Sequence, residues 1–238
     1  MECEQRVVGI ADNHSYEDGF NGKFGEYRIR KIREAISLLP EMNSVLEIGC
    51  GEGRITAFLD GCFERVVAVE PSEKFLEKAK KRATAEFHQS LFENWDSHEK
   101  FDCIVITGVL EHVRDVGVFL RLVKEKMKKE TLVILTVPNA YSLHRRLGLK
   151  MGLIGSLTEL GELDNKVGHY RYYDSVGLIR DLNGNGFAVL SMGGIFLKPL
   201  PFAEIERLPE EYLEALFLVG EEYPESCAEL FVIAKRML

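Results

Sequence analysis

An alternating glycine turn and an acid further along the chain have the residue types and spacing of a cofactor site. Gly49, Gly51 and Gly53 follow a short apolar run, and Glu70 ends the next apolar run, about 20 residues after Gly49. Glycine has no side chain, so a ligand can approach this backbone closely. In a doubly wound sheet the first two strands end side by side, and an acid there would meet both hydroxyls of a ribose lying across the turn. The spacing therefore predicts a nucleoside-containing cofactor.

Two strands and a helix are expected to hold these groups in place. The apolar run 45–48 predicts a strand buried on both faces of a parallel sheet. Residues 55–59 have helical apolar spacing, and residues 65–69 predict a second, β-branched strand. The dinucleotide pattern GxGxxG needs a small residue where Arg54 stands, so an NAD-dependent oxidoreductase remains only as an alternative.

The turn and its flanks read EIGCGEG over residues 47–53, which resembles the first motif of class I S-adenosylmethionine-dependent methyltransferases. The resemblance continues through VVAVEPS, FDCIVITGVLEHV and LVILTVPN and covers residues 44–139. Within that family the chain is similar to members that methylate small molecules, namely ubiquinone-biosynthesis-like and natural-product or polysaccharide-pathway methyltransferases. The fold it implies is α/β: a Rossmann-like, doubly wound, seven-stranded sheet, mostly parallel with an antiparallel last strand, plus an inserted lid.

The resemblance also implies where each part of S-adenosylmethionine binds. Glu70 binds the ribose, the turn makes room for the cofactor, and Glu47 orders a water or the amino group. The loop after the third strand clasps adenine, although Ser90 stands where many relatives carry an acid and Glu93 is the stand-in. The cofactor-binding residues expected in this way are Arg28, Glu47, Gly49, Cys50, Gly51, Gly53, Glu70, Pro71, Ser90, Leu91, Phe92, Thr107 and Gly108.

The chain is expected to divide into an amino-terminal covering helix segment, residues 1–43, and a methyltransferase domain, residues 44–238. Apolar residues recur at helical spacing before Pro40. In the family such a helix closes over the cofactor, so Tyr16, Tyr27 or Arg28 is expected at the methionine carboxylate, where a guanidinium would suit it. The alternative is that these side chains only pack against the protein or face solvent.

Residues 140–174 leave the family pattern and are interpreted as a lid that selects the substrate. The basic residues Arg145, Arg146 and Lys150 have three interpretations: they hold an anionic substrate group such as a diphosphate, rest on anionic lipid, or are solvated. The segment GHYRYYD, residues 168–174, resembles one in polysaccharide and natural-product methyltransferases. The residues proposed to bind substrate are Arg145, Arg146, Tyr170 and Arg171.

Two histidines are candidate catalytic residues. His169 lies among tyrosines, and a neutral imidazole there could accept the proton of an attacking hydroxyl or amine. The alternative is a structural histidine packed by tyrosines. His112, in the EHV motif after the fourth strand, is weighed as a base against a histidine that hydrogen-bonds a loop carbonyl.

Composition limits the classes of function. A net charge of −8 and a pI near 5.4 argue against a nucleic-acid surface, and a small-molecule acceptor is expected. The five cysteines show no CxxC and no Cys/His cluster, so reduced thiols and no metal are expected. The start lacks a signal-peptide pattern and no apolar run could span a bilayer, which predicts a cytoplasmic enzyme without an integral membrane segment. Its oligomeric state stays open.

The predicted reaction is in-line transfer of the sulfonium methyl to an oxygen or nitrogen nucleophile. A non-catalytic S-adenosylmethionine-binding protein is an alternative from a different class. An aminopropyl transferase is a weaker one, supported only by the acidic stretch ELGELD.

Overall fold

The computed structural model describes residue 15, residues 19–37 and residues 42–237, apart from the side chain of residue 202. The expected covering segment 1–43 is therefore described only in part, and Tyr16 lies outside the described residues. Within that segment, α2 (Phe20–Ser37) is the helix that the apolar spacing predicts.

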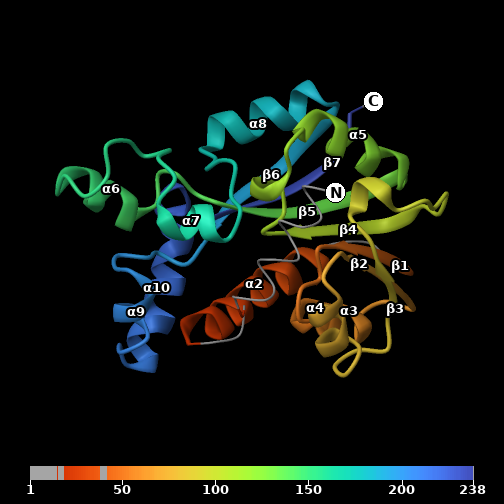
Figure 1. The fold of residues 1–238 in the computed structure, drawn as a ribbon, viewed down its shortest axis with the longest axis horizontal. Helices are drawn as coiled ribbons and strands as arrows, with labels where there is room; N and C mark the ends of the chain where they lie inside the picture. Colours follow the sequence, from red (N-terminus) through yellow and green to blue (C-terminus); the bar gives the residue numbers. More distant parts are fainter. Residues whose placement is uncertain (1–14, 16–18, 38–41, 238) are drawn as a thin grey trace.

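The strands of the described residues form one seven-stranded sheet (Figure 1). They are β1 (Ser44–Ile48), β2 (Arg65–Glu70), β3 (Glu86–Gln89), β4 (Phe101–Thr107), β5 (Met127–Pro138), β6 (Phe187–Ile195) and β7 (Glu229–Arg236). Their order across the sheet is β3-β2-β1-β4-β5-β7-β6. Strands β1 to β5 are parallel, and β7 runs antiparallel to both β5 and β6. This confirms the predicted fold class, including its antiparallel last strand.

Helices cover the sheet and connect its strands. They are α3 (Arg54–Asp60), α4 (Glu73–Ala79), α5 (Val116–Glu125), α6 (Leu143–Lys150), α7 (Glu162–Lys166), α8 (Ser175–Gly184), α9 (Phe202–Ile205) and α10 (Glu210–Glu222), with short 3-10 turns η1 (Phe92–Asn94), η2 (Leu110–His112) and η3 (Pro224–Ser226). Ser72 caps α4 by accepting the Phe75 amide at 3.2 Å, and Asp174 caps α8 by accepting the Gly177 amide at 2.6 Å. None of the described helices is long and apolar enough to cross a membrane.

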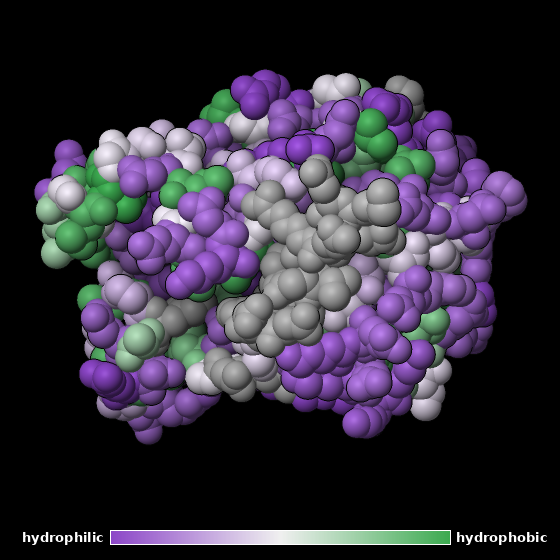
Figure 2. All heavy atoms as spheres, in the orientation of Figure 1, coloured by the Kyte–Doolittle hydropathy of each residue, from purple (hydrophilic) through white to green (hydrophobic). Residues whose placement is uncertain are grey.

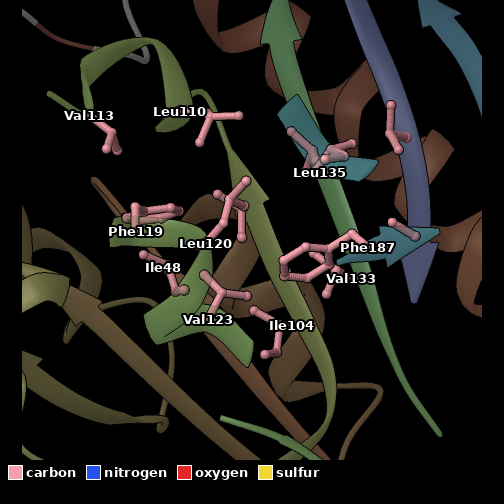
Figure 3. Close-up of a cluster of buried hydrophobic side chains, with 14 of the residues drawn as sticks. Ile48, Ile104, Leu110, Val113, Phe119, Leu120, Val123, Val133, Leu135 and Phe187 are labelled. Carbon is pink, nitrogen blue, oxygen red and sulfur yellow. The ribbon is translucent and has the colours of Figure 1, made fainter. Parts of the chain in front are cut away.

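Two apolar layers enclose the sheet, one on each face. Helices α5 and α8 lie over one face, where Phe119 of α5 belongs to the same buried cluster as Ile48 and Ile104 (Figure 3). Helices α2, α3 and α10 cover the other face. Because successive strand residues point to opposite faces, β4 contributes Ile104 to the first layer and Val105 to the second. The buried strands hold their carboxyl ends, where the predicted site residues lie, at one edge.

The passage from α5 to β5 differs from the expectation. Apolar residues at helical spacing over residues 116–127 predict a helix up to Met127, but α5 ends at Glu125 and β5 begins at Met127. Met127 pairs with Phe101 of β4 across a register shift. Lys128 therefore lies in a strand, where it forms an ion pair with a β4 carboxylate at 2.8 Å, and not at a helix end. A tertiary strand pairing outweighs the local helical pattern here.

Candidate active site

A cavity of about 410 Å³ opens at the carboxyl ends of β1, β2 and β4, where open α/β sheets bind ligands. The predicted cofactor residues that line it are Arg28, Glu47, Gly49, Cys50, Gly51, Glu70, Pro71, Leu91, Phe92, Thr107 and Gly108. Both predicted catalytic histidines, His112 and His169, line it as well. The predicted site residues outside its lining are Gly53, Ser90, Arg145, Arg146, Tyr170 and Arg171.

Glu70 ends β2 with its carboxylate held against the glycine turn. One oxygen accepts the Gly51 amide and the other accepts the Ser72 amide, both at 3.0 Å. Burial raises the pKa of Glu70, and the two hydrogen bonds act in the opposite direction. Each carboxylate oxygen has a second lone pair. The group can therefore accept ribose hydroxyls while it keeps the turn closed.

The glycines of the turn are required by packing within the protein as well as by space for a ligand. Gly49 has φ 76° and Gly53 has φ 83°, which L side chains rarely adopt. A Cβ on Gly49 would lie 2.5 Å from a Val109 methyl, and one on Gly53 would lie 2.6 Å from the Cα of Ala79. Gly53 therefore lets the start of α3 approach α4. The residue packs against α4 and does not line the cavity.

Glu47 borders the cavity beneath the turn and is 1% exposed. Its carboxyl accepts the Thr56 hydroxyl at 2.6 Å. Burial raises the pKa of Glu47 to about 7, against the effect of the Thr56 hydrogen bond, and the Glu70 charge adds to the rise. Near neutral pH a large fraction of this group is therefore protonated and able to donate a hydrogen bond.

Arg28 reaches the cavity as one half of an ion pair. Its Nε donates to Glu229 Oε2 at 2.9 Å, and Nη2 pairs with the other carboxylate oxygen. The guanidinium carbon also lies 5.0 Å from the centroid of the Phe24 ring. Because Glu229 offsets its charge, Arg28 attracts a ligand carboxylate less strongly than the lone guanidinium that the sequence suggested.

The GHYRYYD segment is tied to the loop that follows β4. The Tyr170 amide donates to the Glu111 carbonyl at 2.8 Å. Arg171 donates to the Leu110 and Arg114 carbonyls, each at 3.1 Å, and to the Val113 carbonyl. The Tyr170 amide and the Arg171 guanidinium thus bind backbone carbonyls of the loop. These hydrogen bonds hold the segment that carries His169 against the EHV motif.

Asp164 fixes the ring of His169. Its Oδ1 lies 2.9 Å from His169 Nδ1 and accepts the Tyr172 hydroxyl at 2.7 Å, while Oδ2 accepts the Gly161 amide at 2.8 Å. Burial would raise the pKa of Asp164, but the hydrogen bonds from His169, Tyr172 and Gly161 hold it below its usual value. An ionised Asp164 accepts a hydrogen bond from the Nδ1–H group, and in a neutral ring of this tautomer Nε2 carries the lone pair.

Glu111, His112 and His169 form a cluster at the end of the cavity next to Gly108. One ligand atom from each lies within 4.8 Å of those of the other two. The two imidazole centroids are 4.7 Å apart, edge to face. Glu111 is 3% exposed, its Oε2 has no hydrogen-bond partner among the described residues, and burial raises its pKa to about 7. The spacing of the sequence predicted no metal, but this group has the composition of a metal site.

The expected basic patch of the insertion divides in two. Arg145 is buried, donates to the Leu157 and Glu159 carbonyls at 2.9 and 2.5 Å, and stacks 3.8 Å from the Tyr172 ring centroid. Arg146 and Lys150 are exposed on α6. Figure 2 shows apolar surface over α6, where the exposed apolar residues are Leu147, Met151 and Leu153. A structural role therefore accounts for Arg145. The three interpretations, an anionic substrate group, anionic lipid or solvent, still apply to Arg146 and Lys150.

Several residues of the cavity were not expected from the sequence. Those with chemistry to offer are Glu111, His144, Asp164, Tyr172, Lys198 and Glu229. Burial lowers the pKa of Lys198 to about 8 and, with the charges of Lys198 and Arg145, lowers the pKa of His144 to about 3. Asp164 stands five residues before His169, so its acidic type was a local signal that could have been used. Glu229 is 201 residues from Arg28 and offered none.

Comparisons with known proteins agree with this geometry. A methyltransferase-domain family matches residues 22–192. A ubiquinone biosynthesis O-methyltransferase of Bradyrhizobium diazoefficiens is 33% identical over 100 residues, which are 40% of this chain and 40% of that protein. The match thus spans less than half the length of that relative.

Two solved structures share the fold at low identity. A possible histamine N-methyltransferase of Thermotoga maritima superposes with a TM-score of 0.62 at 22% identity, covering 92% of this chain and 93% of that one. The N-methyltransferase NodS of Bradyrhizobium japonicum, in complex with S-adenosyl-L-homocysteine, gives a TM-score of 0.61 at 11% identity, with coverage of 99% and 97%. Since the family match covers most of the chain, the protein belongs to the methyltransferase family, with the fold of its S-adenosylmethionine-dependent members.

Proposed function

We propose that the protein transfers the methyl group of S-adenosylmethionine to an oxygen or nitrogen nucleophile of a small molecule. One observation carries the proposal: the Glu70 turn and the cluster of Glu111, His112 and His169 line the same cavity. The cofactor supplies a methyl group that its positive sulfur already activates. The protein then has to align the two reactants and deal with the proton of the acceptor.

The donor half of the cavity fits S-adenosylmethionine. Glu70 keeps acceptor capacity for ribose hydroxyls while its carboxylate holds the Gly51 amide. Leu91 and Phe92 offer an apolar wall for adenine, and Glu93, which also lines the cavity, is the stand-in for the family acid that Ser90 replaces. The backbone at Thr107 and Gly108 is assigned to the methionine part, and Arg28, in its pair with Glu229, to the carboxylate end.

The acceptor half is formed where residues 140–174 meet the loop after β4. Asp164 orients His169 so that Nε2 presents a lone pair, and His112 lies edge to face with that ring. We assign to His169 the activation of the acceptor, with His112 as its neighbour. Residues 140–174 act as the lid that excludes water, and Arg145 stabilises the lid from within. Substrate contacts by Arg146, Tyr170 and Arg171 would require the lid to rearrange.

The relatives support an oxygen or nitrogen acceptor of low molecular mass. The curated relative is an O-methyltransferase and both solved structures are described as N-methyltransferases. A ubiquinone-like phenolic acceptor is the finer version of the proposal, and it rests on a match to part of that relative.

Calorimetric titration with S-adenosylmethionine, S-adenosylhomocysteine and NAD tests the donor half. We expect binding of the first two and none of NAD. Glu70→Ala should weaken binding about 10- to 100-fold, as expected for lost hydrogen bonds to a charged group. Glu73→Ala, an exposed acid three residues away on α4, is the matched control and should bind normally. Thermal melts of both variants show that each is folded. Unchanged affinity in Glu70→Ala, or tight binding of NAD alone, would contradict the proposal.

An acceptor screen tests catalysis itself. The wild type is incubated with S-adenosylmethionine and a panel of phenols, sugars and amines, and S-adenosylhomocysteine release is measured. At least one hydroxyl or amine should be methylated. Tight cofactor binding without transfer to any member of a broad panel would instead favour the non-catalytic alternative.

A further inference from the structure

The cluster at the acceptor end has a feature that proton transfer by one imidazole does not require. Glu111 is almost fully buried, and its Oε2 makes no hydrogen bond to any described residue. Desolvating a carboxylate without a partner is unfavourable unless a cation or a donor pairs with it. A Glu111 carboxylate oxygen lies within 4.8 Å of ring nitrogens of two imidazoles, which coordinate metals through a neutral nitrogen. We infer that Glu111, His112 and His169 bind a divalent transition-metal ion.

The distances allow this site with small side-chain movement. Atoms that share a metal at about 2.1 Å lie roughly 3.0 to 3.5 Å apart, depending on the coordination geometry. The three ligand atoms lie within 4.8 Å of one another, so rotation of the two rings and the carboxyl by about 1 Å closes the set. Two imidazoles and one carboxylate suit Mn²⁺, Fe²⁺, Co²⁺ or Zn²⁺ better than Mg²⁺, which prefers oxygen ligands alone.

The surroundings of His169 are those of a metal-bound imidazole. Such a ring usually donates its second N–H to a carboxylate, which fixes its tautomer and orientation. Asp164 takes this place at 2.9 Å, and it is itself held by the Tyr172 hydroxyl and the Gly161 amide. Three protein ligands also leave coordination positions open, as in catalytic metal sites. All three ligands line the cavity that is assigned to the acceptor.

The inference rests on the proposed function and specifies how His169 activates the acceptor. A hydroxyl oxygen of the acceptor occupies an open position, and the ion lowers the pKa of that hydroxyl so that its proton passes to solvent. The resulting oxygen anion attacks the methyl group, an O–C bond forms, and the C–S bond breaks with its electron pair going to sulfur. The expected acceptor is therefore a hydroxyl compound that can coordinate a metal.

Cobalt binding tests the site without any need for turnover. Tag-free, EDTA-treated protein is titrated with Co²⁺, followed by calorimetry and by the visible absorption of the ion. The wild type should bind one Co²⁺ and lose it to EDTA. Glu111→Gln, His112→Ala and His169→Ala should each weaken binding at least about tenfold, and Asp164→Asn should weaken it about 10- to 100-fold through the orientation of His169. His88→Ala, a histidine on β3 outside the cavity lining, is the matched control and should bind as the wild type does.

Two results separate this inference from the proposed function. If the wild type binds Co²⁺ no more tightly than Glu111→Gln, His112→Ala and His169→Ala do, the metal site is wrong. If the same samples still bind S-adenosylmethionine, the proposed cofactor site is unaffected by that result. If Co²⁺ binding is lost in the three variants but the wild type binds no S-adenosylmethionine, the metal site stands and the proposed function fails. Because a variant could lose metal by failing to fold, each is also titrated with S-adenosylmethionine. A variant that binds the cofactor normally and still binds Co²⁺ as tightly as the wild type overturns the assignment of that ligand.

Discussion

Replacing Gly53 by alanine should destabilise the fold far more than it affects the cofactor. The residue has φ 83°, and an added Cβ would lie 2.6 Å from the Cα of Ala79 and 2.7 Å from its Cβ. A left-handed alanine costs roughly 1 to 2 kcal/mol. Forcing apart two packed helices adds about 1 to 3 kcal/mol, because backbone atoms, and not a flexible side-chain end, must move. The expected loss of unfolding free energy is therefore about 2 to 5 kcal/mol.

Two other glycines separate these contributions. Gly152 has φ 72° with nothing within 4 Å of its would-be Cβ, so Gly152→Ala should lose only the backbone part, about 1 to 2 kcal/mol. Gly193 has no neighbour within 4 Å and no left-handed φ, and Gly193→Ala should stay within about 0.5 kcal/mol of the wild type.

Urea unfolding at 25 °C measures all three variants, and titration with S-adenosylmethionine is done on the folded proteins. Since Gly53 does not line the cavity, Gly53→Ala should keep its cofactor affinity within about threefold, a difference of less than 1 kcal/mol. A Gly53→Ala variant no less stable than Gly152→Ala would refute the packing argument. A folded variant that loses the cofactor would show that the glycine serves the ligand directly.

Three further changes test other parts of the site. In urea unfolding Glu47→Gln should be more stable than the wild type at pH 8, and the difference should disappear by about pH 4. A folded pKa of about 7 against 4.5 unfolded makes wild-type stability fall as pH rises through this range, by at most about 3 kcal/mol; parallel pH profiles would contradict it. Asp164→Asn should slow single-turnover methylation at least about tenfold with unchanged cofactor affinity, since the tautomer of His169 is no longer fixed; an unchanged rate would remove the positioning role. Arg145→Lys should speed proteolytic cleavage in residues 150–160, because lysine replaces neither the fork to two carbonyls nor the stacking on Tyr172; equal cleavage rates would mean that the lid does not depend on this residue.

The donor side of the site was predictable because its signals are local. The turn, Glu70 and the strands that carry them lie within one strand–helix–strand unit, and parallel strands must bring their carboxyl ends to one edge. Even here the sequence did not reveal which partner each group has. Glu47 accepts a hydrogen bond from Thr56, and Gly53 has no room for a side chain because Ala79 packs against it. Tertiary packing decides both contacts.

The acceptor side was predictable only as a set of candidates. His112 and His169 were each singled out, but separately, and local spacing predicted no metal. They meet because Tyr170 and Arg171 bind the main chain of the loop after β4, which no short-range pattern encodes. For the same reason Arg145 was predicted to bind substrate, with lipid contact and solvation as alternatives, although its carbonyl partners lie within the insertion.

The sequence by itself determined the family, the order of strands and helices, and the residues of the turn and Glu70 that line one wall of the cavity, since these follow from hydrophobic period, glycine positions and one acid at a set distance. The tertiary structure alone decided which charges are neutralised and which side chains converge. Arg28 and Glu229 are paired across 201 residues, and Glu111, His112 and His169 share one corner of the cavity. The physical reason is that burial and pairing depend on the distance between atoms in the folded chain, and separation along the sequence does not set that distance.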